Sequence, residues 1–350
     1  MQIYAGMDQR LSLAGVSDHA RRVEAIGYDG LNVPDAVHDG LLAAQAALSA
    51  TARLKVATSV LVCFPRSPMN VAHAAWDLQA TSGGRFELGL GSQVRGNIID
   101  RYSTPWTAPV PRMREYVQSL RAIWSCWQDG GELAFEGAHY RFTRMQPFFN
   151  PGPIAHPAIP IFLGAVGPKM TELVGEVADG IMTHPTNGSP RHLREATLPE
   201  LAAGAARAGR ATDTASVMAA GFVATGPTAS EVALQRGRIR ELLAFLYSTP
   251  TYWRSLDVHG WRDVGERLHE LSRQGRWPEM AGAVGDEMLE ALVPQGPYDV
   301  IAATLKAWYD GLADCITFPL PDDRRDDAKV AAVVAQLRER RVEHPRPKAP

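Results

Sequence analysis

The chain has 350 residues, of which 45% are hydrophobic and 21% charged, a composition typical of a globular protein with a large core. The formal net charge is −2 and there is no long basic run, which argues against a nucleic-acid partner. The cysteines, Cys63, Cys126 and Cys315, are odd in number and far apart, so they indicate neither a disulfide framework nor a metal site. Without a leader-like N-terminus or an apolar run of ~18 residues, we expect a cytoplasmic protein with no membrane partner.

Short apolar runs alternate along the chain with longer amphipathic runs. The predicted strands cover residues 3–7, 30–33, 55–63, 86–91, 161–164, 180–183, 216–224 and 314–319. The predicted helices cover residues 17–26, 41–51, 68–80, 112–127, 169–178, 191–208, 230–246, 298–309 and 323–341. A hairpin is predicted around Glu136 and Gly137, and the charged, Pro-rich tail at 343–350 is expected to be disordered.

This alternation of strands and helices indicates parallel strands joined by right-handed crossovers. A count of eight strands favours a closed (β/α)8 TIM barrel, formed by a single domain over residues 1–342, and an open Rossmann sheet is the alternative. No Gly-rich dinucleotide or P-loop motif supports a nucleotide site of the Rossmann or P-loop kind. The insertions, at 92–160 and 249–296, follow the fourth and seventh strands and therefore lie at the C-terminal face, where barrels build active sites.

Gly89 and Gly91 stand near the end of the fourth predicted strand, where they allow a flat ligand to approach the backbone. The alternative is that they only relieve crowding inside the barrel. The order of a strand, Arg-x-Pro, a helix and Ser-Gly-Gly-Arg-Phe-x-Leu-Gly-Leu-Gly over residues 55–91 resembles luciferase-like flavin and deazaflavin oxidoreductases.

More narrowly, the chain is similar to an actinobacterial subgroup that uses the deazaflavin coenzyme F420. The matching segments extend from the first to the last predicted strand: Phe64-Pro65-Arg66-Ser67-Pro68-Met69, Ala75-Trp76-Asp77-Leu78, Gly91-Ser92-Gln93-Val94, Ser248-Thr249-Pro250 with Tyr252, and His259-Gly260-Trp261. The resemblance implies that F420 is the cofactor and that the protein is a homodimer.

The resemblance also implies where the cofactor ring lies. A non-prolyl cis peptide between Ser59 and Val60 is expected to support the ring, with Gly91 and Gln93 along its polar edge. Asp35, directly after the second strand, is expected beside the ring, and helix capping is its alternative role.

Asn97 in the first insertion is expected at the same polar edge of the ring. The subgroup often has histidine at this position, and some relatives have histidine where Ala36 stands. Asparagine cannot exchange a proton as histidine does, so a histidine-based step at this position is in doubt. These departures point to a different substrate or to a lapsed activity.

Ala165, Val166 and Gly167 are small residues that precede Pro168 at the start of a predicted helix. Backbone N–H groups at a helix start favour anions, so these residues, with Lys169, are expected to hold a cofactor phosphate. This position resembles the phosphate loop of the family, and an ordinary barrel loop is the alternative.

His38 and His184 are the candidates for proton transfer, because histidine exchanges protons near neutral pH. His184 follows the sixth strand at the barrel mouth, where a hydrogen-bonded loop residue is the alternative. The histidines show no metal-binding spacing, so no metal is expected.

The implied function is that of an oxidoreductase that transfers a hydride between F420 and a small organic substrate. One alternative is an FMN-dependent monooxygenase that uses molecular oxygen. A second is a flavin-binding barrel that has lost catalysis, which is consistent with Asn97 and Ala36. A barrel aldolase or isomerase is disfavoured, because Lys169 is the only lysine near a strand end that could serve it.

Overall fold

The computed structural model describes residues 1–339, which form a closed parallel barrel. Its strands are β1 (Gln2–Gly6), β2 (Gly30–Val33), β3 (Lys55–Thr58), β4 (Leu61–Val62), β5 (Phe86–Gly91), β8 (Ile161–Ala165), β9 (Gly180–Thr183), β10 (Ser216–Ala219) and β13 (Cys315–Thr317). β3 and β4 are two parts of one position in the barrel wall, which we call a stave, so these nine strands make eight staves. β3 pairs with both β2 and β5, which closes the cycle. The predicted TIM barrel is confirmed, and the open sheet is excluded.

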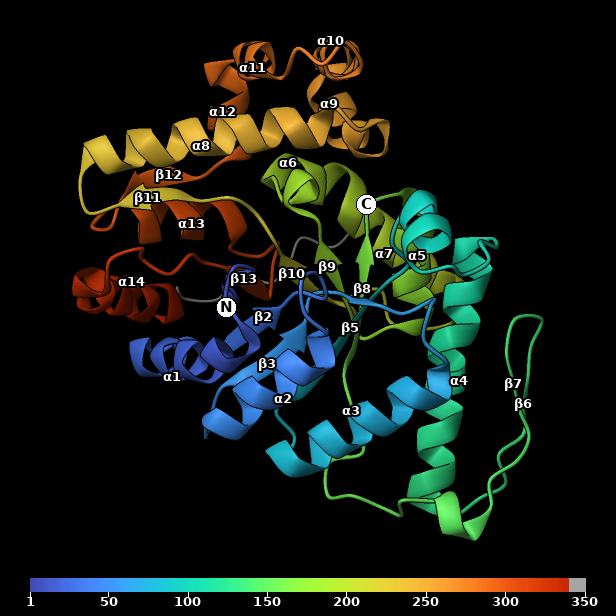
Figure 1. Cartoon of the computed structure of the whole chain (residues 1–350). Coiled ribbons are helices and arrows are strands. Elements are labelled where there is room, and N and C mark those ends of the chain that lie inside the picture. Colours follow the sequence, from blue (N-terminus) through green and yellow to red (C-terminus); the bar gives the residue numbers. More distant parts are fainter. Residues whose placement is uncertain (340–350) are drawn as a thin grey trace.

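Helices surround the strands on all sides (Figure 1). They are α1 (Val16–Ile26), α2 (Gly40–Ala50), α3 (Pro68–Ser82), α4 (Pro109–Asp129), α5 (Pro168–Val177), α6 (Pro190–His192), α7 (Leu198–Arg207), α8 (Ala229–Tyr247), α13 (Ile301–Tyr309) and α14 (Asp327–Arg338). In α1 the buried residues Val16, Ala20, Val23 and Ile26 recur at helical spacing, so one face packs on the barrel. Gly27 then ends the helix with a φ of 103°, which favours glycine.

The interior of the barrel is filled by side chains from strands around the cycle. These residues are Tyr4, Ala57, Phe162, Met182, Met218 and Cys315. A Cβ on Gly30 would lie 2.5 Å from the ring of Tyr4, and a Cβ on Gly180 would lie 2.4 Å from the ring of Phe162. Both glycines therefore make room for an aromatic ring, and the barrel is a packed core rather than a pore.

Two predicted strands differ from the structure. The third stave is interrupted by a cis peptide between Ser59 and Val60, which confirms the bond that the family resemblance implied. The seventh strand, predicted over 216–224, is wrong beyond Ala219, because Ala224–Gly226 (β11) leaves the barrel and pairs with Gln295–Pro297 (β12). Both pieces are largely buried, so hydrophobicity alone could not show where the chain departs. The predicted disordered tail at 343–350 lies outside the described residues.

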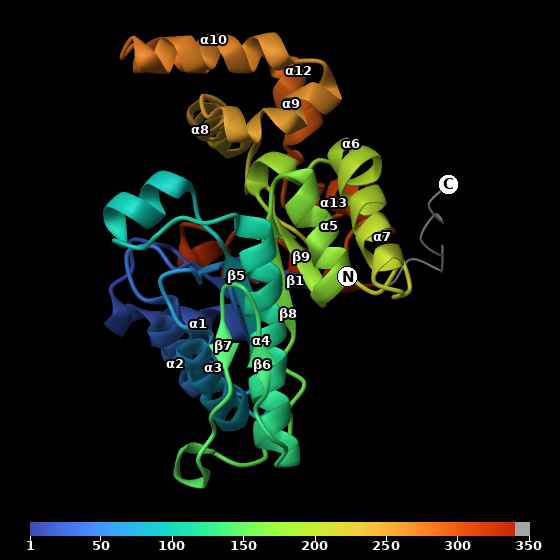
Figure 2. The same cartoon turned by 90° about the vertical axis from the view of Figure 1, so that its right-hand side faces the viewer.

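The first insertion contains α4 and the predicted hairpin, formed by β6 (Phe135–Glu136) and β7 (Arg141–Phe142). The hairpin lies beside α4 (Figure 2), where the backbone N–H groups of residues 138–140 donate to the Glu115 carboxylate.

The second insertion forms a helical layer at one end of the barrel (Figures 1 and 2). It comprises α9 (Trp253–His259), α10 (Arg262–Arg273), α11 (Trp277–Met280) and α12 (Asp286–Leu292), which pack with α8 around a core of their own. In the described part of the chain, no helix has both the length and the apolar character needed to cross a bilayer.

Candidate active site

A cavity of about 990 Å³ lies at the C-terminal mouth of the barrel. Residues at or just beyond the ends of the staves line it, among them Gly6, Asn32, Val60, Gly91, Ala165, Thr183, Ala220 and Thr317. The second insertion contributes Thr251 and Tyr252, which lie just before α9 and form part of the wall. A concave, mostly apolar site with a few converging polar groups is typical of small-molecule binding.

The floor of the cavity is built around Ser59 and Val60, which both line it. A Cβ on Gly91 would lie 2.4 Å from Cγ2 of Val60, and a Cβ on Gly164 would lie 3.2 Å from its Cγ1. A Cβ on Gly89 would lie only 1.9 Å from the carbonyl oxygen of Thr58. The glycines therefore relieve crowding around this stave, and Gly91 also lines the cavity as predicted.

The start of α5 forms one wall of the cavity, where Ala165, Val166, Gly167 and Lys169 all lie. Gly167 is the N-cap residue and provides no side-chain cap. Neither Val166 nor Gly167 donates its N–H to another residue within 1–339. Space remains beside Gly167, where an added Cβ would meet nothing within 4 Å. An open helix start beside a lysine suits an anionic group.

His184 follows β9 and lines the cavity with Tyr252 from the helical layer. The two rings stack with centroids 4.4 Å apart and planes 10° apart. Nδ1 of His184 lies 2.9 Å from Oγ1 of Thr186, while Nε2 makes no hydrogen bond to any described residue. Burial lowers the pKa of His184 to about 4, so the ring is neutral near pH 7.

Gln93 lines the cavity and has a φ of 58°. Its Oε1 accepts hydrogen bonds from the N–H of Val94 at 3.0 Å and from Nδ2 of Asn97 at 3.1 Å. Asn97 itself, which is predicted at the polar edge of the ring, does not line the cavity. Asn97 instead contacts the cavity wall indirectly, through its hydrogen bond to Gln93.

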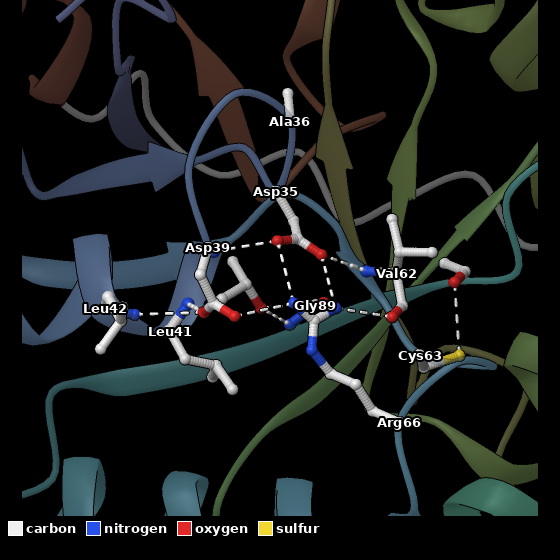
Figure 3. A network of polar contacts seen from close by, with 12 residues as sticks. Asp35, Ala36, Asp39, Leu41, Leu42, Val62, Cys63, Arg66 and Gly89 are labelled. Atoms are coloured by element: carbon white, nitrogen blue, oxygen red, sulfur yellow. Dashed lines mark hydrogen bonds and ion pairs between the residues drawn. The ribbon is translucent and has the colours of Figure 1, made fainter. Parts of the chain in front are cut away.

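Asp35 does not line the cavity either, although the resemblance placed it beside the ring. Its side chain is only 5% exposed and pairs with Arg66, with Oδ2 and Nη1 2.7 Å apart (Figure 3). The carboxylate also accepts hydrogen bonds from the N–H groups of Gly40 and Val62. Asp35 therefore connects the loop after β2 to β4. This structural role is closer to the alternative prediction, helix capping, although the N-cap residue of α2 is Asp39.

His38 lies outside the cavity wall as well. Its Nε2 is 3.1 Å from the carbonyl oxygen of Leu11, so the ring links two loops. The geometry does not support proton transfer by His38, and His184 is the predicted histidine that reaches the cavity.

Asn32 and Thr317 form a polar pair in the cavity wall that the sequence analysis missed. Nδ2 of Asn32 donates to Oγ1 of Thr317 at 3.2 Å, and Oδ1 of Asn32 is buried without a hydrogen-bond partner. An orphaned polar atom in a cavity wall is a natural contact for a bound ligand. The signal in the sequence was an asparagine inside the buried strand Gly30–Val33.

The family model described as luciferase-like monooxygenase matches residues 2–315. The chain is 43% identical over 325 residues to the uncharacterized protein Rv1360 of Mycobacterium tuberculosis, covering 89% of this chain and 95% of that protein. It is 30% identical over 280 residues to the putative coenzyme F420-dependent oxidoreductase Rv3520c of the same organism, covering 74% and 77%. The coenzyme F420-dependent tetrahydromethanopterin reductase of Methanopyrus kandleri has the same fold, with a TM-score of 0.78 at 18% identity and coverage of 96% and 98%. The chain belongs to the luciferase-like monooxygenase family.

Proposed function

We propose that the protein transfers a hydride between coenzyme F420 and a small organic substrate. The observation that carries this proposal is that one cavity combines two features. Val60 forms an apolar floor, and the start of α5 offers unpaired N–H groups beside Lys169. A planar deazaflavin ring joined to a phosphate needs both features. The relative named as an F420-dependent oxidoreductase supports the same cofactor.

The residues of the cavity fit this cofactor in three ways. Ser59 and Val60 support one face of the ring, because glycines of the neighbouring staves leave the Val60 side chain room to rise. The N–H groups of Val166 and Gly167, together with the Lys169 ammonium, bind the phosphate by charge-assisted hydrogen bonds. The orphaned Oδ1 atom at Asn32 accepts a hydrogen bond from a ligand that reaches the floor.

F420, when bound, supplies the two-electron chemistry at its ring. The protein orients the reactants, and the stacked rings of Tyr252 and His184 line the cavity, where they shield the reacting atoms from water on that side. Because His184 is neutral near pH 7, its Nε2 accepts the proton of a substrate hydroxyl when the substrate is oxidised, and the imidazolium so formed returns that proton in the reverse direction.

The proposal is tested by a spectral titration of the purified protein with oxidised F420 and, in parallel, with FMN. We expect saturable quenching of F420 fluorescence. Lys169→Gln should weaken the binding of F420 by about tenfold, the size of one charge-assisted hydrogen bond. Lys306→Gln is the control, because Lys306 lies in the last turn of α13 and outside the cavity.

Unchanged F420 fluorescence together with tight binding of FMN would overturn the proposal in favour of a flavin-dependent monooxygenase. Binding of F420 without turnover of any alcohol, aldehyde or ketone tested would instead indicate a barrel that binds its cofactor and has lost catalysis.

A further inference from the structure

A second cavity of about 800 Å³ opens beside the active-site cavity. The loop that follows β1, the helix α8 and the loop that follows β13 form its walls. Gly6, Met7, Gly221 and Thr317 line both cavities, so the two spaces adjoin at the ends of β1, β10 and β13. We refer to the second space as the side cavity.

The position of the side cavity follows from the order of the staves. β1 and β8 are four staves apart in a cycle of eight, so they lie on opposite sides of the barrel. The anion-binding start of α5 follows β8, whereas the side cavity begins at β1. If the proposed function holds, a cofactor anchored at α5 extends across the mouth and leaves the side cavity free for the substrate.

Most charged groups around the side cavity already have partners. Asp8 pairs with Arg10 at 2.7 Å, and Asp18 pairs with Arg21 at 2.5 Å. Arg22 is held by Asp327 at 2.6 Å and also donates to a backbone carbonyl group. These groups are therefore largely neutralised within the protein and leave little charge for a ligand.

Arg238 and Arg324 differ from these paired residues. Both line the side cavity, and neither guanidinium donates a hydrogen bond to any residue in the described range 1–339. The nearest carboxylate oxygen to Arg238 is Oδ2 of Asp322, 3.6 Å from Nη1, which is too long for a hydrogen bond. Arg238 thus has one long ion pair, and Arg324 has no ion pair with any carboxylate in the described range, which leaves donors and positive charge for an anion.

Apart from His19 and Gln235, the remaining walls of the side cavity are mostly apolar. They include Leu11, Phe222, Val223, Ile239 and Leu242. Leu242 is 47% exposed, which is consistent with an apolar surface left open for a ligand. A ligand that matches this cavity has an apolar body and a terminal anion.

We propose that the side cavity binds the tail of the substrate, an apolar chain that ends in a carboxylate or a phosphate. The reacting end passes Thr317 into the active-site cavity, while the terminal anion binds between Arg238 and Arg324. This proposal rests on the proposed function for the identity of the reaction, but the binding site can be tested without the cofactor.

The test is calorimetric titration of the full chain, free of cofactor, with octanoate, octyl phosphate and octanol as probes. At least one of the two anions should bind saturably and at least about tenfold more tightly than octanol, since a guanidinium contributes charge-assisted hydrogen bonds. Arg238→Gln and Arg324→Gln should each weaken binding of that anion by about tenfold. Arg325→Gln is the matched control, because Arg325 pairs with Asp323 and does not line the side cavity.

Equal affinity for octanol and both anions would overturn the inference, as would an equal loss in the Arg325→Gln control. Saturable anion binding that depends on Arg238 and Arg324 supports the site even if F420 fails to bind. That result would contradict the proposed function alone. Conversely, F420 binding without anion binding leaves the proposed function standing and removes this inference alone.

Discussion

Asp35 is a nearly buried carboxylate whose charge is compensated by Arg66. Arg66→Gln would leave that charge without its ion pair, so we expect the free energy of unfolding to fall by about 3 kcal/mol. Urea unfolding followed by circular dichroism measures this change. Arg141→Gln, which breaks the exposed ion pair with Glu136, should leave stability unchanged. An equal effect of the two substitutions would show that Asp35 does not depend on Arg66.

His184 makes stability depend on pH, because burial lowers its pKa to about 4 from an unfolded value of about 6.5. Above pH ~6.5 both states are neutral and the residue has no effect. As the pH falls toward ~4, only the unfolded chain binds the proton, so stability decreases and then levels off. We expect His184→Gln to lose less stability than the wild type between pH 7 and 4.5, by on the order of 2 kcal/mol. Parallel pH curves from urea unfolding would contradict this prediction.

At the scale of elements, replacing two glycines by alanine should change the stability of the protein in opposite directions. A Cβ at Gly89 would lie 1.9 Å from the carbonyl oxygen of Thr58, so Gly89→Ala must push β5 and β3 apart and should cost about 2 kcal/mol or more. Gly237 lies inside α8 with nothing within 4 Å of an added Cβ. Gly237→Ala should therefore stabilise the protein by about 0.5–1 kcal/mol. Thermal and urea unfolding test both, and effects of the same sign would contradict the prediction.

The boundaries of elements could be predicted where a local signal marks them. Phe86–Gly91 and Gly180–Thr183 match their predicted ranges, because apolar runs end there at clear changes in sequence character. The strand predicted over 216–224 failed, because β10 and β11 are both buried although only β10 belongs to the barrel. Which sheet a buried strand joins depends on partners distant in sequence, here Gln295–Pro297.

At the scale of the whole molecule, the barrel and the helical layer have separate cores. Leu268 is fully buried in the helical layer, so Leu268→Ala should destabilise that layer by about 3 kcal/mol. In hydrogen exchange measured by mass spectrometry, α9–α12 should lose protection while the barrel strands keep theirs. Leu88→Ala, in the barrel core, should instead lower protection throughout. If Leu268→Ala lowered protection equally in α9–α12 and in the barrel strands, the two parts would unfold as one cooperative unit.

The sequence by itself determined the barrel, the cis peptide between Ser59 and Val60, and the helix start at Gly167, because each depends on a local pattern or a long family match. Only the tertiary structure decided which polar side chains reach the cavity. Asp35 turns toward Arg66, whereas Tyr252 arrives from an insertion distant in sequence. The side cavity likewise joins loops from both ends of the chain. Such contacts depend on how the barrel closes and how its insertions pack, and no local pattern of residues encodes them.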